Sequence, residues 1–154
     1  MRKAIVICGF PGVGKTCVAN NRTNILDAES SAFSWTFDPE NTEVRERNSA
    51  FPLNYIEYIR GNMEKYDIIL ASSHKAVREA LTAEGIPYII VAPYVTLKNE
   101  YLKRYLQRGS DIEFIELLNE KWCDFVDDIY RDGAPVIWLG AGEYLSDVLG
   151  EIAR

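Results

Sequence analysis

The sequence predicts an α/β fold in which a five-stranded parallel sheet lies between two layers of helices. Apolar runs of strand length alternate along the chain with segments whose apolar residues recur at helical spacing. Most of these runs are continuously apolar, which is typical of strands that helices cover on both faces. Alternating strands and helices also favour right-handed βαβ crossovers, which make neighbouring strands parallel.

Five apolar runs are the expected strands. They are KAIVIC (3–8), NIL (24–26), DIILA (67–71), PYIIV (87–91) and PVIWL (135–139). In open parallel sheets, ligands bind at the carboxyl ends of the strands. The residues that follow these runs are therefore the first candidates for a functional site.

Apolar residues at helical spacing predict the helices that connect the strands. Gly85 and Gly109 are expected to end the second and third of these helices, and a capping box of Ser110 and Glu113 is expected to open the fourth. The residues expected on the buried faces are Leu53, Ile56, Ile59 and Met63; Ala76, Val77, Ala80 and Leu81; Leu97, Tyr101, Leu102 and Tyr105; Phe114, Leu117, Leu118, Trp122, Phe125 and Ile129; and Leu145, Val148, Leu149 and Ile152.

The connection 28–52, AESSAFSWTFDPENTEVRERNSAFP, does not follow this rhythm. It is polar and has little periodicity, although it carries the aromatic residues Phe33, Trp35 and Phe37. Irregular connections longer than about 15 residues are uncommon in compact domains and are usually functional or mobile. We expect the three aromatic side chains either to stack on a nucleobase or to form an apolar plug beneath the loop.

Length and composition indicate one globular domain, 1–154. The chain has 154 residues, of which 47% are hydrophobic, and this is enough to bury a core. A formal net charge of −6 argues against stable binding of nucleic acid or a membrane surface, since both need a basic face. The first apolar run is too short for a signal peptide or a membrane span. We expect a cytoplasmic protein, either a monomer or a homodimer.

Three cysteines, Cys8, Cys17 and Cys123, make an odd count without metal-ligand spacing. We expect them to be buried thiols in a reducing compartment.

The first expected strand runs directly into a glycine-rich turn. In KAIVICGFPGVGKT (3–16), Gly9, four residues, Gly14, Lys15 and Thr16 match the P-loop pattern. Backbone N–H groups can close around phosphate oxygens only where no Cβ intrudes, and the following helix directs its positive end at the same anion. The alternative, a glycine turn without a ligand, leaves Lys15 and Thr16 unexplained. The residues expected to bind the triphosphate of ATP are Gly9, Pro11, Gly12, Val13, Gly14, Lys15, Thr16 and Cys17.

The residue types suit a phosphate and a magnesium ion. Lys15 is expected to bridge the β and γ phosphates as a compact cation, and the Thr16 hydroxyl is expected to ligate Mg²⁺. Asp27 and Glu29 follow the second expected strand at the ligand edge of the sheet. Either carboxylate is a candidate for holding a metal-bound water or accepting the proton of an attacking group. The alternative for Asp27 is a turn cap.

The chain resembles the nucleoside monophosphate kinases and, more narrowly, small phage-type P-loop proteins labelled adenylate or nucleotide kinases. Besides the P-loop, the similar segments are ILDAESSAF (25–33), NYIEYI (54–59), YDIILASSHKAVREAL (66–81), IPYIIVAP (86–93) and GEYLSDVL (142–149). The resemblance implies a three-layer P-loop NTPase fold. It also implies a phosphate-acceptor region at 28–66 and a short lid at 98–112, with Arg104 and Arg108 closing over the phosphates.

One stretch departs from this family. Adenylate kinases carry Asp followed by Gly-Phe-Pro-Arg after the third strand, whereas this chain has LASSHKAVR (70–78). Ser72 and Ser73 thus stand where a metal-orienting carboxylate is expected, and Arg78 falls inside a helix. In the related shikimate kinases the metal-side carboxylate comes from the end of the second strand, where Asp27 lies.

Several other polar residues are weaker candidates. Ser73 is expected to cap a helix with His74 in its first turn, and the alternative is a hydrogen bond from this region to the γ phosphate. Arg104 and Arg108 share one helix face, so the alternative to a lid is a solvated surface. Arg45, Arg47 and Arg60 lie in the acceptor region, where exposed arginines are common.

The function expected from these features is an ATP- and Mg²⁺-dependent transfer of the γ phosphate to a nucleoside or deoxynucleoside monophosphate. Lys15, Asp27, Arg104 and Arg108 are the expected catalytic residues, and Thr16 and Asp27 the expected metal ligands. Two alternatives remain: a nucleotide-binding switch without turnover, and a kinase for a polynucleotide 5′-hydroxyl or a small metabolite.

Overall fold

The computed structural model describes residues 3–20, 22–30, 33, 35–37 and 45–152, and within them five parallel strands form one sheet. The order across the sheet is β2-β5-β1-β6-β7, which is 2-3-1-4-5 when these strands are counted along the chain. The five-stranded parallel sheet expected from the sequence is therefore confirmed. The strands are β1 (Ile5–Gly9), β2 (Ile25–Asp27), β5 (Ile68–Ser72), β6 (Tyr88–Pro93) and β7 (Val136–Leu139).

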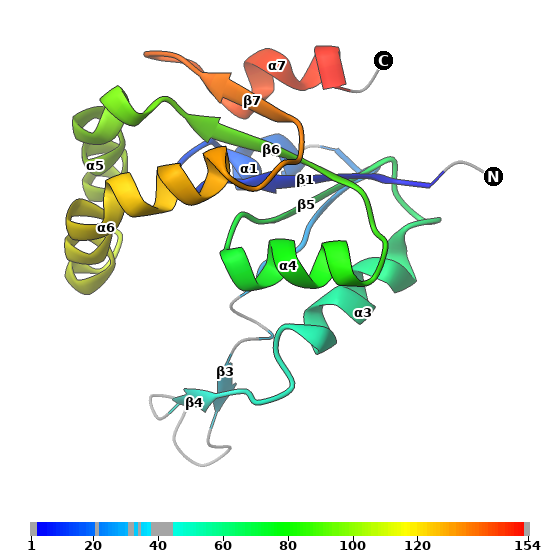
Figure 1. The fold of residues 1–154 in the computed structure, drawn as a ribbon. Coiled ribbons are helices and arrows are strands. Elements are labelled where there is room, and N and C mark those ends of the chain that lie inside the picture. Colours follow the sequence, from blue (N-terminus) through cyan, green and yellow to red (C-terminus); the bar gives the residue numbers. More distant parts are fainter. Residues whose placement is uncertain (1–2, 21, 31–32, 34, 38–44, 153–154) are drawn as a thin grey trace.

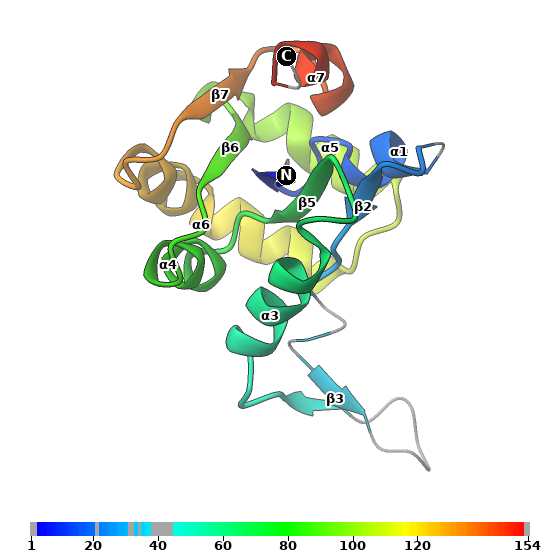
Figure 2. The ribbon, with the colours of Figure 1, turned by 90° about the vertical axis from the view of Figure 1, so that its right-hand side faces the viewer.

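Helices cover both faces of the sheet. Figures 1 and 2 show α1 and α7 on one face and α4 and α6 on the other, and α3 packs beside α4. The pair α5 and α6 extends past the carboxyl ends of the strands (Figure 1). The helices are α1 (Lys15–Ala19), α3 (Leu53–Asn62), α4 (Lys75–Ala83), α5 (Lys98–Gln107), α6 (Ile112–Tyr130) and α7 (Leu145–Ile152), with a 3₁₀ turn η1 (Val95–Leu97) before α5.

Burial is continuous along the middle of the central strands. Ile7 and Cys8 of β1 and the segments 69–71 of β5 and 90–92 of β6 are all 0% exposed. This pattern agrees with the uninterrupted apolar runs in the sequence, because each of these strands has a helix layer on both sides. The edge strand β7 is half-buried until its last residue, Leu139.

Two glycines end helices as the sequence predicts. Gly85 (φ +71°) follows α4 and Gly109 (φ +77°) follows α5. At α5 the Gly109 amide donates to the Leu106 carbonyl at 3.2 Å and the Ser110 amide donates to the Tyr105 carbonyl at 3.0 Å, which is the Schellman pattern. Gly85 and Ile86 make the same two bonds at the end of α4.

The predicted start of α6 is wrong. The residue preceding the helix is Asp111 rather than Ser110, and it makes no side-chain capping bond. The Ser110 hydroxyl instead accepts a hydrogen bond from Arg108 Nε at 2.8 Å. The capping box is therefore replaced by a contact across the α5–α6 turn.

The segment 28–52 contains regular structure that its sequence pattern does not predict. β3 (Trp35–Phe37) and β4 (Arg45–Arg47) pair as an antiparallel ribbon that projects from the body below α3 (Figure 1). Phe33 packs against α3, with its ring centroid 5.4 Å from that of Tyr55 and 4.9 Å from that of Tyr58. These contacts favour the apolar-plug interpretation for Phe33. The side chains of Trp35 and Phe37 lie outside the described part.

Some burial predictions are also corrected. Only Cys8 is a buried thiol, whereas Cys17 and Cys123 are exposed. Leu53 and Leu117 are 58% and 47% exposed. The buried face of α6 is Leu118, Trp122, Val126 and Ile129, and Leu117 lies one residue away from it.

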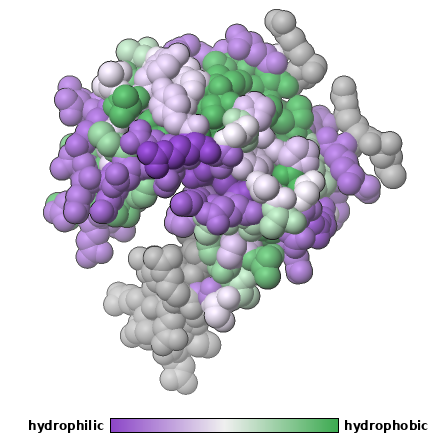
Figure 3. Space-filling model, viewed as in Figure 1, coloured by the Kyte–Doolittle hydropathy of each residue, from purple (hydrophilic) through white to green (hydrophobic). Residues whose placement is uncertain are grey.

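Hydrophilic side chains gather over α5 and α6 on the face drawn in Figure 3. Within the described residues, none of the helices combines the length and the apolar composition needed to span a membrane.

Candidate functional site

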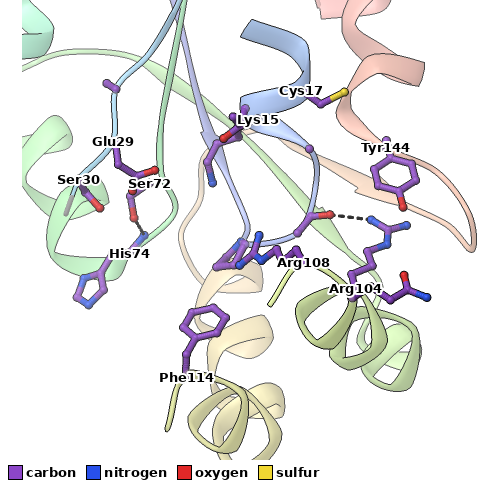
Figure 4. Close-up of a pocket in the computed structure, with 16 residues that line it drawn as sticks. Lys15, Cys17, Glu29, Ser30, Ser72, His74, Arg104, Arg108, Phe114 and Tyr144 are labelled. Atoms are coloured by element: carbon purple, nitrogen blue, oxygen red, sulfur yellow. Dashed lines mark hydrogen bonds between the residues drawn. The ribbon is translucent and has the colours of Figure 1, made fainter. Parts of the chain in front are cut away.

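A pocket of about 720 Å³ opens at the carboxyl ends of the strands, where the sheet topology predicts a site. It lies between the turn after β1, the chain after β2, the end of β5, the helix α5 and the start of α7 (Figure 4). The lining residues are Pro11, Gly12, Gly14, Lys15, Thr16, Cys17, Ala28, Glu29, Ser30, Ser72, His74, Arg104, Gln107, Arg108, Phe114 and Tyr144.

Six of the eight residues expected to bind nucleotide line this pocket; Gly9 and Val13 do not. Gly12 and Gly14 both have left-handed backbone, with φ +93° and +96°. A Cβ on Gly12 would also lie 3.0 Å from Tyr105 Cε1, and one on Gly9 would lie 2.8 Å from Lys15 Cδ. The glycines of the motif are therefore required by conformation and by close packing of side chains on the turn.

Lys15 begins α1 and points back along the turn. Its Nζ donates a hydrogen bond to the Gly9 carbonyl at 2.6 Å. Burial lowers the pKa of Lys15 below its ordinary value, and the carboxylates of Glu29 and Asp27 act in the opposite direction. The ammonium is thus a poorly hydrated cation that lies within the field of both carboxylates.

Thr16 and Asp27 meet across the turn and β2. Thr16 Oγ1 donates to Asp27 Oδ2 at 3.1 Å, while Asp27 Oδ1 is buried and has no hydrogen-bond partner among the described residues. A hydroxyl beside a carboxylate with a spare oxygen fits the chemistry of Mg²⁺, which takes few protein ligands and completes its shell with phosphates and water. In the described part of the chain, no cluster of three or more His, Cys, Asp or Glu residues could bind a metal by itself.

Arg104 and Arg108, the expected lid arginines, differ from each other in burial and in their contacts. Arg104 is 9% exposed and donates to the Gly12 carbonyl at 2.8 Å, the Glu143 carbonyl at 3.0 Å and Glu100 Oε2 at 2.7 Å. Arg108 is exposed, and its guanidinium lies 5.0 Å from the centre of the Tyr105 ring. Figure 4 shows Arg108 near the middle of the pocket and Arg104 at the side of Tyr144. Arg104 is thus tied to the turn itself.

The opposite end of the pocket is formed by Glu29, Ser30, Ser72 and His74, which Figure 4 shows grouped together. His74, rather than Ser73, precedes α4 as its cap, because its Nδ1 accepts from the Ala76 amide at 3.2 Å. The Ser72 hydroxyl accepts from the His74 amide at 3.1 Å. These two contacts fix the chain at the end of β5.

Tyr55 was not predicted to belong to the site. Its hydroxyl donates to the Ala28 carbonyl at 2.5 Å and accepts from the Ser72 amide at 3.2 Å. Burial raises the pKa of Tyr55, so the hydroxyl remains a donor at neutral pH. Tyr55 thereby joins the ends of β2 and β5 just where Glu29 and Ser72 enter the pocket. The sequence offered only the helical spacing of NYIEYI as a signal.

Arg78 lies inside α4, as the sequence predicts, and is 4% exposed. Its Nη1 bonds Asp132 Oδ1 at 2.5 Å and its Nε donates to the Ser73 carbonyl at 2.7 Å. Arg78 therefore supports the Ser73–His74 chain from below and does not line the pocket.

Of the acceptor-region arginines, the described side chain is that of Arg60, and it does not line the pocket. Arg60 pairs with Glu84, 3.5 Å away, beside a second hollow that also contains Lys3, next to the start of β1. It therefore lies at the amino ends of the strands, away from the site. The side chains of Arg45 and Arg47 lie outside the described part.

A scan against protein-family models and a search of curated proteins both found no match for this chain. The fold and the site define an α/β protein with a five-stranded parallel sheet and, at its carboxyl edge, a pocket into which charged and hydroxyl side chains project.

Proposed function

We propose that this protein is a P-loop phosphotransferase that moves the γ phosphate of ATP to a small nucleotide, with a nucleoside monophosphate as the first candidate. The observation that carries the proposal is the contact of Thr16 with Asp27 at the carboxyl edge of the sheet, where Asp27 Oδ1 is buried and has no partner within the described residues. Thr16 and Lys15 line the pocket, and Asp27 lies behind Thr16 without lining it. The strand order 2-3-1-4-5 supports assignment of the P-loop NTPase fold.

Each residue has a defined role in this proposal. The amides of the turn and the first turn of α1 hold the triphosphate, because the first N–H groups of a helix have no partner inside it. Lys15 exchanges its bond to Gly9 for the β and γ phosphates. Thr16 and Asp27 would hold Mg²⁺, which supplies charge neutralisation at the phosphates.

Arg108 is the cation best placed to follow the phosphoryl group during transfer. It is exposed, lines the pocket and is the residue that caps the C-terminus of α5, beside Gly109. Phosphoryl transfer depends on positioning and on neutralising the equatorial oxygens more than on covalent chemistry. A monophosphate acceptor attacks with an oxygen that is already ionised and needs no base.

A coupled assay of ADP release tests the proposal across nucleoside and deoxynucleoside monophosphates. We expect ADP release that depends on one acceptor and requires Mg²⁺. Lys15→Met is expected to lower turnover by at least about a thousandfold while preserving the fold, since Lys15 acts on phosphate charge. Tight binding of ATP without acceptor-dependent release would favour the nucleotide switch instead.

The acceptor end supports a second candidate, a kinase for a hydroxyl acceptor. Among the described residues lining that end, Glu29 is the charged side chain, and Ser30, Ser72 and His74 are its neighbours. A carboxylate can accept the proton of an attacking hydroxyl, but it repels a monophosphate. Comparing nucleosides, sugars and 5′-hydroxyl oligonucleotides with monophosphates in the same assay separates the two candidates by which class of acceptor stimulates ADP release.

A further inference from the structure

We infer that Arg104 and Tyr105 are positioning residues that hold the backbone of the phosphate loop, here residues 9–16, in its anion-binding orientation. The inference rests on the proposed function, since it concerns how that loop receives a triphosphate. It replaces the expected lid role of Arg104 with a role in holding the loop, through its bond to the Gly12 carbonyl.

Three consecutive carbonyls of the phosphate loop are bound by donors from the C-terminal half of the chain. The Tyr105 hydroxyl donates to the Pro11 carbonyl at 2.8 Å, and Arg104 Nη1 donates to the Gly12 carbonyl at 2.8 Å. The Leu145 amide donates to the Val13 carbonyl at 2.8 Å. Each donor lies more than ninety positions away along the sequence, so the loop is held by tertiary contacts.

The planarity of the peptide bond converts these contacts into amide orientation. In a trans peptide, a carbonyl and the following N–H point in opposite directions. Holding the carbonyls of Pro11 and Val13 outward therefore turns the amides of Gly12 and Gly14 towards the opposite side. A carbonyl released towards the pocket would present negative charge to a phosphate, which lowers affinity.

Arg104 is suited to this task by its planar guanidinium. Besides Gly12, it binds the Glu143 carbonyl and Glu100, and its Cζ lies 3.9 Å from the centre of the Tyr144 ring. Glu100 in turn accepts from the Gly142 amide at 3.1 Å. The phosphate loop, α5 and the chain before α7 are thus joined through one buried cation, and a lysine cannot make this set of bonds.

Tyr101 provides a matched control on the same helix. Tyr101 and Tyr105 are both 0% exposed, and both rings pack on Gly12, at 3.1 Å and 3.0 Å from a Cβ placed there. The two hydroxyls differ. That of Tyr105 donates to the Pro11 carbonyl, whereas that of Tyr101 makes no hydrogen bond to the described residues of the phosphate loop. Replacing each tyrosine by phenylalanine keeps the ring that packs on Gly12 and removes only the hydroxyl. A difference between the two variants therefore reports on the hydrogen bond to the loop.

The experiment compares Tyr105→Phe, Tyr101→Phe and Arg104→Lys by calorimetric titration with ATP and Mg²⁺. We expect Tyr105→Phe to weaken ATP binding about tenfold, which corresponds to the loss of one hydrogen bond that orders the loop. Arg104→Lys is expected to weaken it at least as much, and Tyr101→Phe is expected to stay within about twofold of the wild type. The ³¹P resonance of the bound β phosphate is expected to shift in Tyr105→Phe alone of the two tyrosine variants.

Thermal melts followed by circular dichroism on the same samples show whether a change in ATP affinity merely reflects a less stable fold. A lower melting temperature with unchanged ATP affinity and an unchanged ³¹P resonance in Tyr105→Phe and Arg104→Lys would overturn the inference and leave the proposed function intact. Wild-type protein that binds no triphosphate would instead overturn the proposed function, and the inference with it.

Discussion

The charge of Lys15 is subject to two opposed effects, burial of its ammonium and attraction by nearby carboxylates. Burial of its ammonium lowers the pKa of Lys15 from its ordinary 10.5, and the carboxylates of Glu29 and Asp27 limit that decrease. The Gly9 carbonyl supplies one hydrogen bond to the ammonium at 2.6 Å. The net lowering of the pKa shows that these partners compensate the cation incompletely, and this favours binding of an anion.

If the protein binds MgATP as proposed, the lowered pKa of Lys15 predicts that MgATP affinity and the free energy of unfolding change in opposite directions with pH. Between the lowered pKa of folded Lys15 and 10.5, the unfolded chain binds more protons than the folded one. The free energy of unfolding that Lys15 contributes therefore rises with pH in this window when nucleotide is absent. Affinity for MgATP falls over the same window, because phosphates prefer the charged lysine.

Calorimetric titration with MgATP from about pH 7 to about pH 10 tests the binding trend, since this range approaches the ordinary lysine pKa. Lys15→Arg is the control, because arginine remains charged throughout this pH range. Its affinity for MgATP should therefore not show the fall with pH that deprotonation of Lys15 causes. An equal loss of affinity in wild type and Lys15→Arg would assign the trend to other groups.

At the scale of elements, Tyr55 connects α3 to β2 and β5, the two strands that lead into the end of the pocket lined by Glu29 and Ser72. The ladder between β2 and β5 ends with Asp27 opposite Leu70, and the Ala28 amide still bonds the Leu70 carbonyl. Beyond that point the Tyr55 hydroxyl bridges Ala28 and Ser72. It thus sets the separation at which β2 and β5 enter the site.

Replacing Tyr55 by Phe leaves a buried carbonyl and a half-buried amide without this partner. We expect a loss of about 1–3 kcal/mol in the free energy of unfolding, measured by urea denaturation. We also expect weaker acceptor dependence in the coupled assay with little change in ATP affinity, because the phosphate loop is not touched. Tyr58→Phe is the matched control, since Tyr58 lies on the same helix and is 38% exposed. Equal losses in both variants would refute the bridging role.

Some residues of the site can be predicted from the sequence, and others cannot. Lys15, Thr16 and Asp27 could be placed in advance because a local motif and the end of a strand fix their positions. The roles of Tyr55, Arg104 and Tyr105 could not, since each depends on a backbone group far away in the chain. The ribbon β3–β4 was missed because strands of three residues carry too few positions to show periodicity. Ser110 was misassigned because Arg108 takes its hydroxyl.

At the scale of the whole molecule, a buried ion pair joins α4 to the turn between α6 and β7. Arg78 Nη1 and Asp132 Oδ1 lie 2.5 Å apart, with side chains 5% and 9% exposed. The Tyr88 hydroxyl of β6 also donates to Asp132 at 2.7 Å. Removing one partner of such a pair leaves the other charge buried, which is more costly than never having had the pair.

Asp132→Asn is expected to lower the free energy of unfolding by on the order of 3 kcal/mol at neutral pH. Burial raises the pKa of Asp132, but bonds from Tyr88 and Arg78 outweigh burial, so the net pKa lies below 3.8. The stabilisation is therefore complete above about pH 4 and is lost as the pH falls through the lowered pKa. Urea denaturation from about pH 7 down to about pH 2 should show the wild type converging on Asp132→Asn in acid.

Asp124→Asn is the control for this experiment, because Asp124 lies on the exposed surface of α6.

Arg78 also donates to the Ser73 carbonyl, so the same pair supports the chain that carries His74 into the pocket. Asp132→Asn should consequently weaken acceptor-dependent turnover while ATP affinity is retained. A constant stability difference between wild type and Asp132→Asn at every pH would show that Asp132 does not titrate below its ordinary pKa, and would contradict the assignment of the pair as the acid-sensitive link between α4 and β7.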